Sequence, residues 1–424
     1  MNKRTLTLLS LAICPVLAMG QIDGYRATYY VDGNKENYQY RSSIQLESTN
    51  ANASTVYATN GVELILIDMA INKTMGGCAD ENRRLTGVNS AVLADGSSNI
   101  HMEGCDIKSN CECADGFSAV GEGTKANIYK GSIRMTRAEG AAVNVSQNAK
   151  INIEKAVIET YASHSPAFYA ISNGSVDVLA CTGKNSGQVS PLFYSSKGNI
   201  KAQNCIMGTD RWSIGCIDEG SLELTKNELK TKNLCGFLVY GAKECERESR
   251  TWGKLILNNN RLEVSEGPLV FVTNSGGDIY LSRNKISCSN DEIISIKADD
   301  WGIQGQNYGE AKVTLEKQSL NGDILVDDQS SLDLNLKKGS KLNGNITGPN
   351  SSKRTVKVYM GKGAKWSFKG DCYLTSISFE QPFEKGLKQI KGKHTIYYDS
   401  SDPANAALNG KEYKTSKGGV LKPM

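Results

Sequence analysis

One residue position recurs along most of this chain at intervals of about 24 residues. Each recurrence lies five residues after the first aliphatic residue of a strand-like run, as Cys205 follows Ile200 and Asn260 follows Leu255. The early occupants are small or carry a thiol and the later ones are carboxamides: Cys105, Ala156, Cys181, Cys205, Asn227, Asn260, Asn284 and Gln318. Two steps are longer, 260 − 227 = 33 and 318 − 284 = 34, and indicate one unit plus an insertion of about ten residues. Self-similarity at a fixed period predicts a solenoid, in which each coil covers the open face of its neighbour.

The pattern of apolar and polar residues between these positions identifies the kind of coil. Apolar and polar residues alternate in runs such as Ile151-Asn152-Ile153 and Leu222-Glu223-Leu224, which is typical of strands with one buried face. The chain has 42 Gly and only 8 Pro, and clusters of Asn, Ser and Gly separate the runs as turn signals. The sequence therefore predicts an all-β fold, a right-handed parallel β-helix (β-solenoid) with three short strands and about 24 residues per coil, capped at both ends.

The recurring column has a structural explanation. Coils stack about 4.8 Å apart, so equivalent side chains lie directly over one another. Asn227, Asn260 and Asn284 can then form a ladder of amide hydrogen bonds, and an Asn at a turn also supports left-handed or Asx geometry. We expect these three residues to be structural rather than ligand-binding, because buried amides need partners. Cys181 and Cys205 are expected to fill the same interior position as small apolar groups, one coil apart and not bonded to each other.

The N-terminus predicts export. Lys3 and Arg4 precede an apolar segment, residues 6–17, and a small-x-small cleavage site, residues 18–20. The apolar segment is too short for a membrane span, no second one follows, and we expect a secreted or cell-surface protein. We divide the chain into a signal peptide, an N-terminal cap, the parallel β-helix, and narrower terminal coils with a C-terminal cap: residues 1–20, 21–70, 71–348 and 349–424.

Without Cys14, eleven cysteines remain, so at least one is unpaired within the chain. Export permits disulfides, and a local bridge among Cys105, Cys111 and Cys113 is one expectation. The pair Cys111 and Cys113 has no matching Cys or His pair nearby, which argues against a structural zinc site.

A resemblance to known proteins rests on five segments, residues 267–274, 322–348, 365–375, 397–399 and 404–410. They resemble a broad group of exported bacterial right-handed parallel β-helix proteins, which are pectate-lyase-like or adhesin-like and mostly without assigned activity. The resemblance covers roughly residues 85–424. It implies the β-helix fold and a secreted or surface role, but not a chemistry, because one fold serves many functions.

Two classes of function remain open. One is a non-catalytic, adhesin-like surface protein that binds extended glycans, with a surface or extracellular polysaccharide as its partner. The other is a polysaccharide lyase or hydrolase of the pectate-lyase-like fold, the only alternative that calls for a cofactor, calcium held by carboxylates. No catalytic constellation is recognisable: Asp299-Asp300 lacks companions, and His101, His164 and His394 share no spacing. The net charge is only +4 and the Lys and Arg residues are spread out with no basic stripe, so nucleic acid is not an expected partner.

A ligand site is predicted at the corner that carries both insertions. One insertion follows Tyr240 and the other begins near Asp299 and Asp300, so two raised loops should flank a low coil. Each loop carries a Trp, and charges of both signs lie beside them, as a glycan site requires. The candidate residues are Tyr240, Arg247, Trp252, Asp299, Asp300 and Trp301. The alternative is that Trp252 and Trp301 fold back on the outer sheet and only seal the loop bases.

Overall fold

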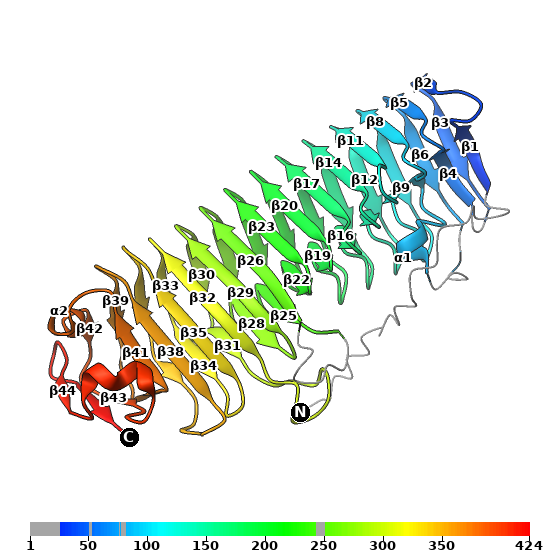
Figure 1. The fold of residues 1–424 in the computed structure, drawn as a ribbon. Coiled ribbons are helices and arrows are strands. Elements are labelled where there is room, and N and C mark those ends of the chain that lie inside the picture. Colours follow the sequence, from blue (N-terminus) through cyan, green and yellow to red (C-terminus); the bar gives the residue numbers. More distant parts are fainter. Residues whose placement is uncertain (1–25, 51–52, 76, 78–81, 243–250) are drawn as a thin grey trace.

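The computed structural model describes residues 26–50, 53–75, 77, 82–242 and 251–424. They form an elongated parallel β-solenoid in which successive coils stack along one axis (Figure 1). Three sheets run along most of its length. Sheet A has 13 strands: β1 (Arg26–Asp32), β4 (Ala53–Thr59), β7 (Val92–Ala94), β10 (Phe117–Val120), β13 (Val143–Ser146), β16 (Phe168–Ile171), β19 (Phe193–Ser196), β22 (Gly215–Asp218), β25 (Phe237–Tyr240), β28 (Val270–Thr273), β31 (Glu292–Ile296), β34 (Asp323–Val326) and β37 (Ile346–Thr347).

The second and third strands of the coils form the other two long sheets. Sheet B has 14 strands: β2 (Tyr38–Ser42), β5 (Glu63–Ile67), β8 (Asn99–Glu103), β11 (Lys125–Tyr129), β14 (Lys150–Glu154), β17 (Ser175–Leu179), β20 (Asn199–Gln203), β23 (Ser221–Thr225), β26 (Trp252–Asn258), β29 (Gly276–Ser282), β32 (Glu310–Glu316), β35 (Ser331–Leu336), β38 (Thr355–Met360) and β41 (Ser376–Phe379). Sheet C has 10 strands: β3 (Gln45–Ser48), β6 (Ala70–Lys73), β9 (Asp106–Ser109), β12 (Ser132–Met135), β15 (Val157–Thr160), β18 (Thr182–Asn185), β21 (Ile206–Thr209), β24 (Glu228–Thr231), β27 (Arg261–Val264) and β30 (Lys285–Cys288).

Smaller elements lie toward the C-terminus and beside the stack. Sheet D contains β33 (Ser319–Asn321), β36 (Lys341–Asn343), β39 (Lys365–Ser367) and β42 (Ile390–Lys391). Sheet E contains β40 (Cys372–Leu374), β43 (Thr395–Tyr398), β45 (Val420–Pro423) and β44 (Tyr413–Lys414), and its pair β44–β45 is antiparallel. The described residues contain the helices α1 (Arg83–Thr86) and α2 (Phe383–Leu387) and the 3₁₀ helix η2 (Pro403–Leu408).

The segment expected as an N-terminal cap contributes coils to the stack. Strands β1–β3 pair in register with β4–β6, which in turn pair with β7–β9. No change of pairing marks residue 70 in the part of the chain that is described. The recurring column begins only at Cys105. The coils before it have no column residue, so the repeat could not be recognised there from the sequence.

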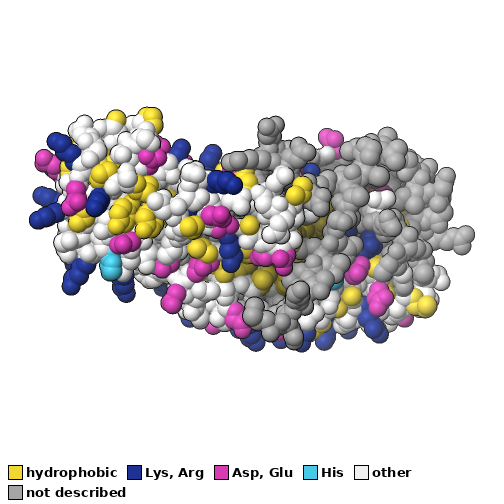
Figure 2. All heavy atoms as spheres, turned by 90° about the horizontal axis from the view of Figure 1, so that it is seen from below, with side chains coloured by type: hydrophobic (Ala, Val, Ile, Leu, Met, Phe, Trp, Pro, Cys, Tyr) yellow, Lys and Arg dark blue, Asp and Glu magenta, His cyan; other side chains and the backbone are white. Residues whose placement is uncertain are grey.

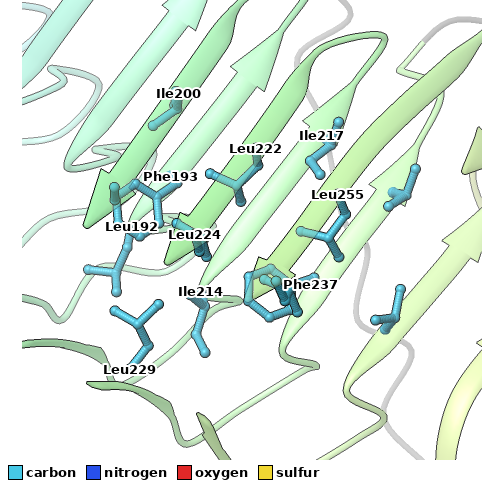
Figure 3. Packing of buried hydrophobic residues seen from close by; sticks show 14 of the residues in the cluster. Leu192, Phe193, Ile200, Ile214, Ile217, Leu222, Leu224, Leu229, Phe237 and Leu255 are labelled. Carbon is cyan, nitrogen blue, oxygen red and sulfur yellow. The ribbon is translucent and has the colours of Figure 1, made fainter. Parts of the chain in front are cut away.

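The interior is filled by the inward residues of all sheets. In sheet B, Ile200, Leu222 and Leu255 are register partners in three successive coils and are all buried (Figure 3). Phe193 and Phe237 of sheet A are buried in the same core cluster. Since each coil buries its apolar residues against the next, the rod has one continuous core.

The structure confirms one of the two cysteine expectations and contradicts the other. Cys181 and Cys205 are buried free thiols, which confirms the prediction for that pair. The local bridge among the other three is not formed, because Cys105 and Cys111 are also free thiols, whereas Cys113 is disulfide-bonded to neither of them. Proximity in sequence gave the expectation, but the side chains of Cys105 and Cys111 turn into buried positions of the core instead.

Candidate functional site

Trp252, expected in a raised loop, lies in a strand of sheet B. It is the first residue of β26, and 39% of its surface is exposed. Its register partner in the next coil is Gly276, whose missing side chain leaves room for the indole: a Cβ there would lie 2.4 Å from ring carbons. The Nζ of Lys312 lies 4.9 Å from the ring centroid. Trp252 is therefore held on the outer face of sheet B.

Trp301 packs against a different surface. Its ring centroid lies 5.8 Å from that of Tyr240 and 6.3 Å from that of Phe271, both on the outer face of sheet A. These residues belong to a lateral apolar cluster with Trp212 and Cys216. Trp301 thus folds back onto the sheet as in the alternative interpretation, and neither tryptophan ring stacks on the other.

The two aspartates of this loop make local contacts. The backbone N–H of Asp300 donates to Oδ1 of Asp299 at 2.7 Å, and the Asp299 carbonyl accepts from the side chain of Asn307. Within the described chain neither carboxylate forms an ion pair with Lys or Arg. Arg247 lies outside the described residues. Of the predicted site residues, the structure brings together Tyr240 and Trp301.

The lateral cluster borders one carboxyl with unusual acidity. Asp218, at the end of β22, is 8% exposed and accepts from the backbone N–H of Ala242 at 3.3 Å and from the hydroxyl of Ser196 at 3.3 Å. Burial is the main cause that raises its pKa to about 6, because desolvation disfavours the charged form. The adjacent hydroxyls of Tyr194 and Tyr240 lie 2.6 Å apart.

The opposite end of sheet B forms a second corner, where the chain turns into sheet C. The residue before each position of the recurring column has a left-handed backbone, with φ of 56° at Lys226, 55° at Asn259 and 52° at Arg283. The column residue that follows points inward. The left-handed residue is therefore the one before the carboxamide, not the carboxamide itself. At each corner the side chain of the left-handed residue lies outside the coil and that of the next residue lies inside.

The carboxamides at this corner form a continuous ladder. Nδ2 of Asn227 donates to Oδ1 of Asn260 at 3.1 Å, Nδ2 of Asn260 to Oδ1 of Asn284 at 3.0 Å, and Nδ2 of Asn284 to Oε1 of Gln318 at 3.2 Å. Each acceptor oxygen also takes the backbone N–H of the preceding column residue, at 2.7–2.9 Å. Four coils are thereby fixed at one spacing along the corner.

A trough lies outside this ladder. It is a cavity of about 510 Å³. A second cavity of about 360 Å³ on the outer face of sheet C shares Ile206, Glu228 and Arg261 with it. We call the first cavity the corner trough, and it is lined by Asn204, Cys205, Ile206, Lys226, Asn227, Glu228, Asn259, Asn260, Arg261, Arg283 and Lys285.

The corner trough is electropositive. Its lining has four cations, Lys226, Arg261, Arg283 and Lys285, against the single carboxylate of Glu228. Arg261 Nε lies 3.9 Å from Glu228 Oε1, with both side chains more than half exposed, and such a pair contributes only about 0–1 kcal/mol. The expectation of no basic stripe is therefore wrong for this corner. The cations come from three coils and become neighbours only when the coils stack.

The neighbouring cavity is closer to charge balance, because its lining holds Lys184, Lys230, Lys232 and Arg261 against Asp210, Glu228 and Glu263. Asp210 binds Lys184 Nζ at 3.0 Å and Lys232 Nζ at 2.9 Å, and hydrogen bonds from these lysines lower its pKa to about 2. On the face drawn in Figure 2, the described Lys and Arg side chains are interspersed with Asp and Glu. The corner trough thus differs from this cavity in its larger excess of cations over carboxylates.

No protein-family model and no curated protein matches this chain. No helix among the described residues has the length and apolar character needed to cross a membrane. The same residues contain no group of three or more His, Cys, Asp or Glu side chains arranged to hold a metal ion.

Proposed function

We propose that this protein is a non-catalytic, adhesin-like solenoid that is secreted or displayed at a cell surface and binds extended glycans along the corner trough. The observation that carries the proposal is the trough itself: a cavity of about 510 Å³ that crosses successive coils and is lined by charged and amide side chains. Arg and Asn side chains offer several directed donors to sugar hydroxyls and acidic groups. We further infer that the coils are right-handed, as in the exported β-helix proteins that the chain resembles.

Two features of the trough support a polymer rather than a small ligand. It shares Ile206, Glu228 and Arg261 with the second cavity, so concave surface lies on both sides of these residues and extends beyond one coil corner. Ile206 is 60% exposed there and offers an apolar contact for one face of a sugar ring. The ladder beneath holds the lining coils in fixed positions, which lowers the entropy lost on binding.

A glycan array with the purified protein tests this function, with calcium and with EDTA in parallel. We expect binding to a subset of polysaccharides in both conditions, with no release of reducing ends from the bound polymer. Release of reducing ends or of unsaturated products would instead establish the lyase or hydrolase alternative. Absence of binding to every glycan would refute the proposal.

A further inference from the structure

The charge arrangement of the corner trough points to a narrower class of ligand. We infer that the trough binds an acidic polysaccharide that runs across the coils, with its acidic groups on Lys226, Arg261, Arg283 and Lys285 and without a bridging calcium ion. This inference rests on the proposed function, because it names the glycan class that the trough accepts. Sulfate and carboxylate groups share the relevant chemistry, an anion carried by a sugar residue.

The four cations have no better partners within the protein. Lys226, Arg283 and Lys285 form no ion pair among the described residues, and Arg261 has only the long, exposed contact with Glu228. Two of these cations, Lys226 and Arg283, are left-handed corner residues, and they project outward because the carboxamides that follow them occupy the interior. Their charge therefore remains available to a ligand.

Two of the cations repel each other in the unliganded protein. Arg261 and Lys285 are direct register partners on the adjacent strands β27 and β30, and both are exposed on the outer face. Like charges directly opposite each other on neighbouring strands destabilise a sheet. An anion between them would relieve this repulsion. Binding is therefore favoured at a place where like charges destabilise the unliganded protein.

The spacing of the cations fits a polymer of sugars. Neighbouring coils are about 4.8 Å apart, which is close to the length of one sugar residue in an extended chain. Each acidic group at contact distance gains roughly 1 kcal/mol even at the dielectric constant of water. The guanidinium groups of Arg261 and Arg283 can each bind a carboxylate or sulfate through two hydrogen bonds.

The same lining argues against nucleic acid. Single-stranded nucleic acids are bound through aromatic side chains that stack on the bases, and no residue that lines the corner trough is aromatic. Four cations are also fewer than the roughly 6–10 phosphate contacts of a typical DNA-binding protein. A sugar ring needs no aromatic floor and can pack on Ile206.

The test compares binding of three dextran-sized probes to the full protein in EDTA: dextran sulfate, the polyuronate alginate, and neutral dextran. The variant is the double substitution Arg283→Gln and Lys285→Gln. Its control is Lys125→Gln with Lys150→Gln, because these exposed lysines are also register partners but lie on sheet B outside the trough. Circular dichroism checks that both variants are folded.

We expect the parent to bind at least one acidic probe, with affinity that falls as salt rises, and the trough variant to bind at least tenfold more weakly. The control variant should keep its affinity within about twofold. Equal loss in both variants would overturn the inference, since it would show attraction to net charge alone. Loss of binding in EDTA, or equally tight binding of a single-stranded DNA oligonucleotide through the same two residues, would also overturn it. Binding of neutral dextran alone would refute the acidic class but leave the proposed function intact, whereas binding of no glycan on the array refutes both.

Discussion

The amide ladder predicts the effect of removing one rung, Asn260→Leu. The Asn260 carboxamide makes four contacts: Oδ1 accepts from the backbone N–H and Nδ2 of Asn227 at 2.9 and 3.1 Å, and Nδ2 donates to the Leu224 carbonyl at 2.8 Å and to Oδ1 of Asn284 at 3.0 Å. Leucine is similar in size, so the change removes hydrogen bonds with little change of volume. It leaves the N–H of Asn227 and the carbonyl of Leu224 buried without these partners.

The expected loss of stability follows from these contacts. Each buried group left without a partner costs about 1–3 kcal/mol, and the apolar leucine offsets a part, so we expect about 3 kcal/mol in all. Urea unfolding followed by circular dichroism measures the total. Hydrogen exchange of the Asn227 amide measures the local effect, and its protection should fall by a larger factor than that of amides several coils away, because coils contact only their neighbours.

The matched control is Asn152→Leu. Asn152 is exposed and donates to Oδ1 of Asn127 in the preceding coil at 2.9 Å, so it forms the same kind of bond between coils in contact with water. Its replacement should change stability by less than about 0.5 kcal/mol. If Asn260→Leu and Asn152→Leu shift the unfolding midpoint equally, and the Asn227 amide keeps its protection, the burial argument is wrong.

Three further predictions concern single groups. The pKa of Asp218 is raised to about 6, so the folded state binds the proton of this carboxyl more tightly than the unfolded state does. The parent protein should therefore lose stability relative to Asp218→Asn as the pH rises from 3.8 to about 6. Urea midpoints of the two proteins that keep a constant difference over this range would contradict the prediction. Burial raises the pKa of the Cys181 thiol to about 12, so iodoacetamide should label Cys181 and Cys205 only after denaturation, and a mapped disulfide between them would refute the assignment. Trp301→Ala should lower the free energy of unfolding by about 2 kcal/mol, because it removes the ring that packs on the lateral cluster. Trp252→Ala should lower it by less than about 0.5 kcal/mol. The reverse order of thermal midpoints would show that the packing is misassigned.

The repeat could be predicted because its causes are local and periodic. Alternation in runs such as residues 151–153 and 222–224 defines strands with one buried face, and the column of carboxamides requires register between coils. The partners of Asn227, Asn260 and Asn284 follow from stacking alone. The left-handed residue was placed one position too late, because the pattern shows which residue is invariantly small or amide-bearing but not which one makes the turn.

The candidate surface could not be predicted in the same way. The four cations Lys226, Arg261, Arg283 and Lys285 lie up to 59 positions apart in the chain, and the step that contains an insertion obscures their alignment. A signal was present nonetheless: Lys226 and Arg283 immediately precede the column, and Lys285 immediately follows it. A map of charge relative to the column, rather than along the chain, would have shown the cluster.

The packing of Trp301 shows a second limit of prediction from the sequence. Periodicity locates the loop that carries it but carries no information on the direction in which the loop folds. That direction is decided by tertiary contacts, here the rings of Tyr240 and Phe271 on the outer face of sheet A. An aromatic residue in an insertion is therefore weak evidence for a binding site until its packing is known.

Lysine footprinting with and without a saturating acidic polysaccharide tests the central claim most directly. The protein is acetylated briefly in each condition, and mass spectrometry reports the extent of modification at each lysine. Binding at the corner trough predicts that Lys226 and Lys285 become protected while Lys125 and Lys150, on sheet B outside the trough, are modified as in the free protein. Equal protection of all four lysines, or protection of Lys125 and Lys150 alone, would contradict the assignment of this corner as the binding surface.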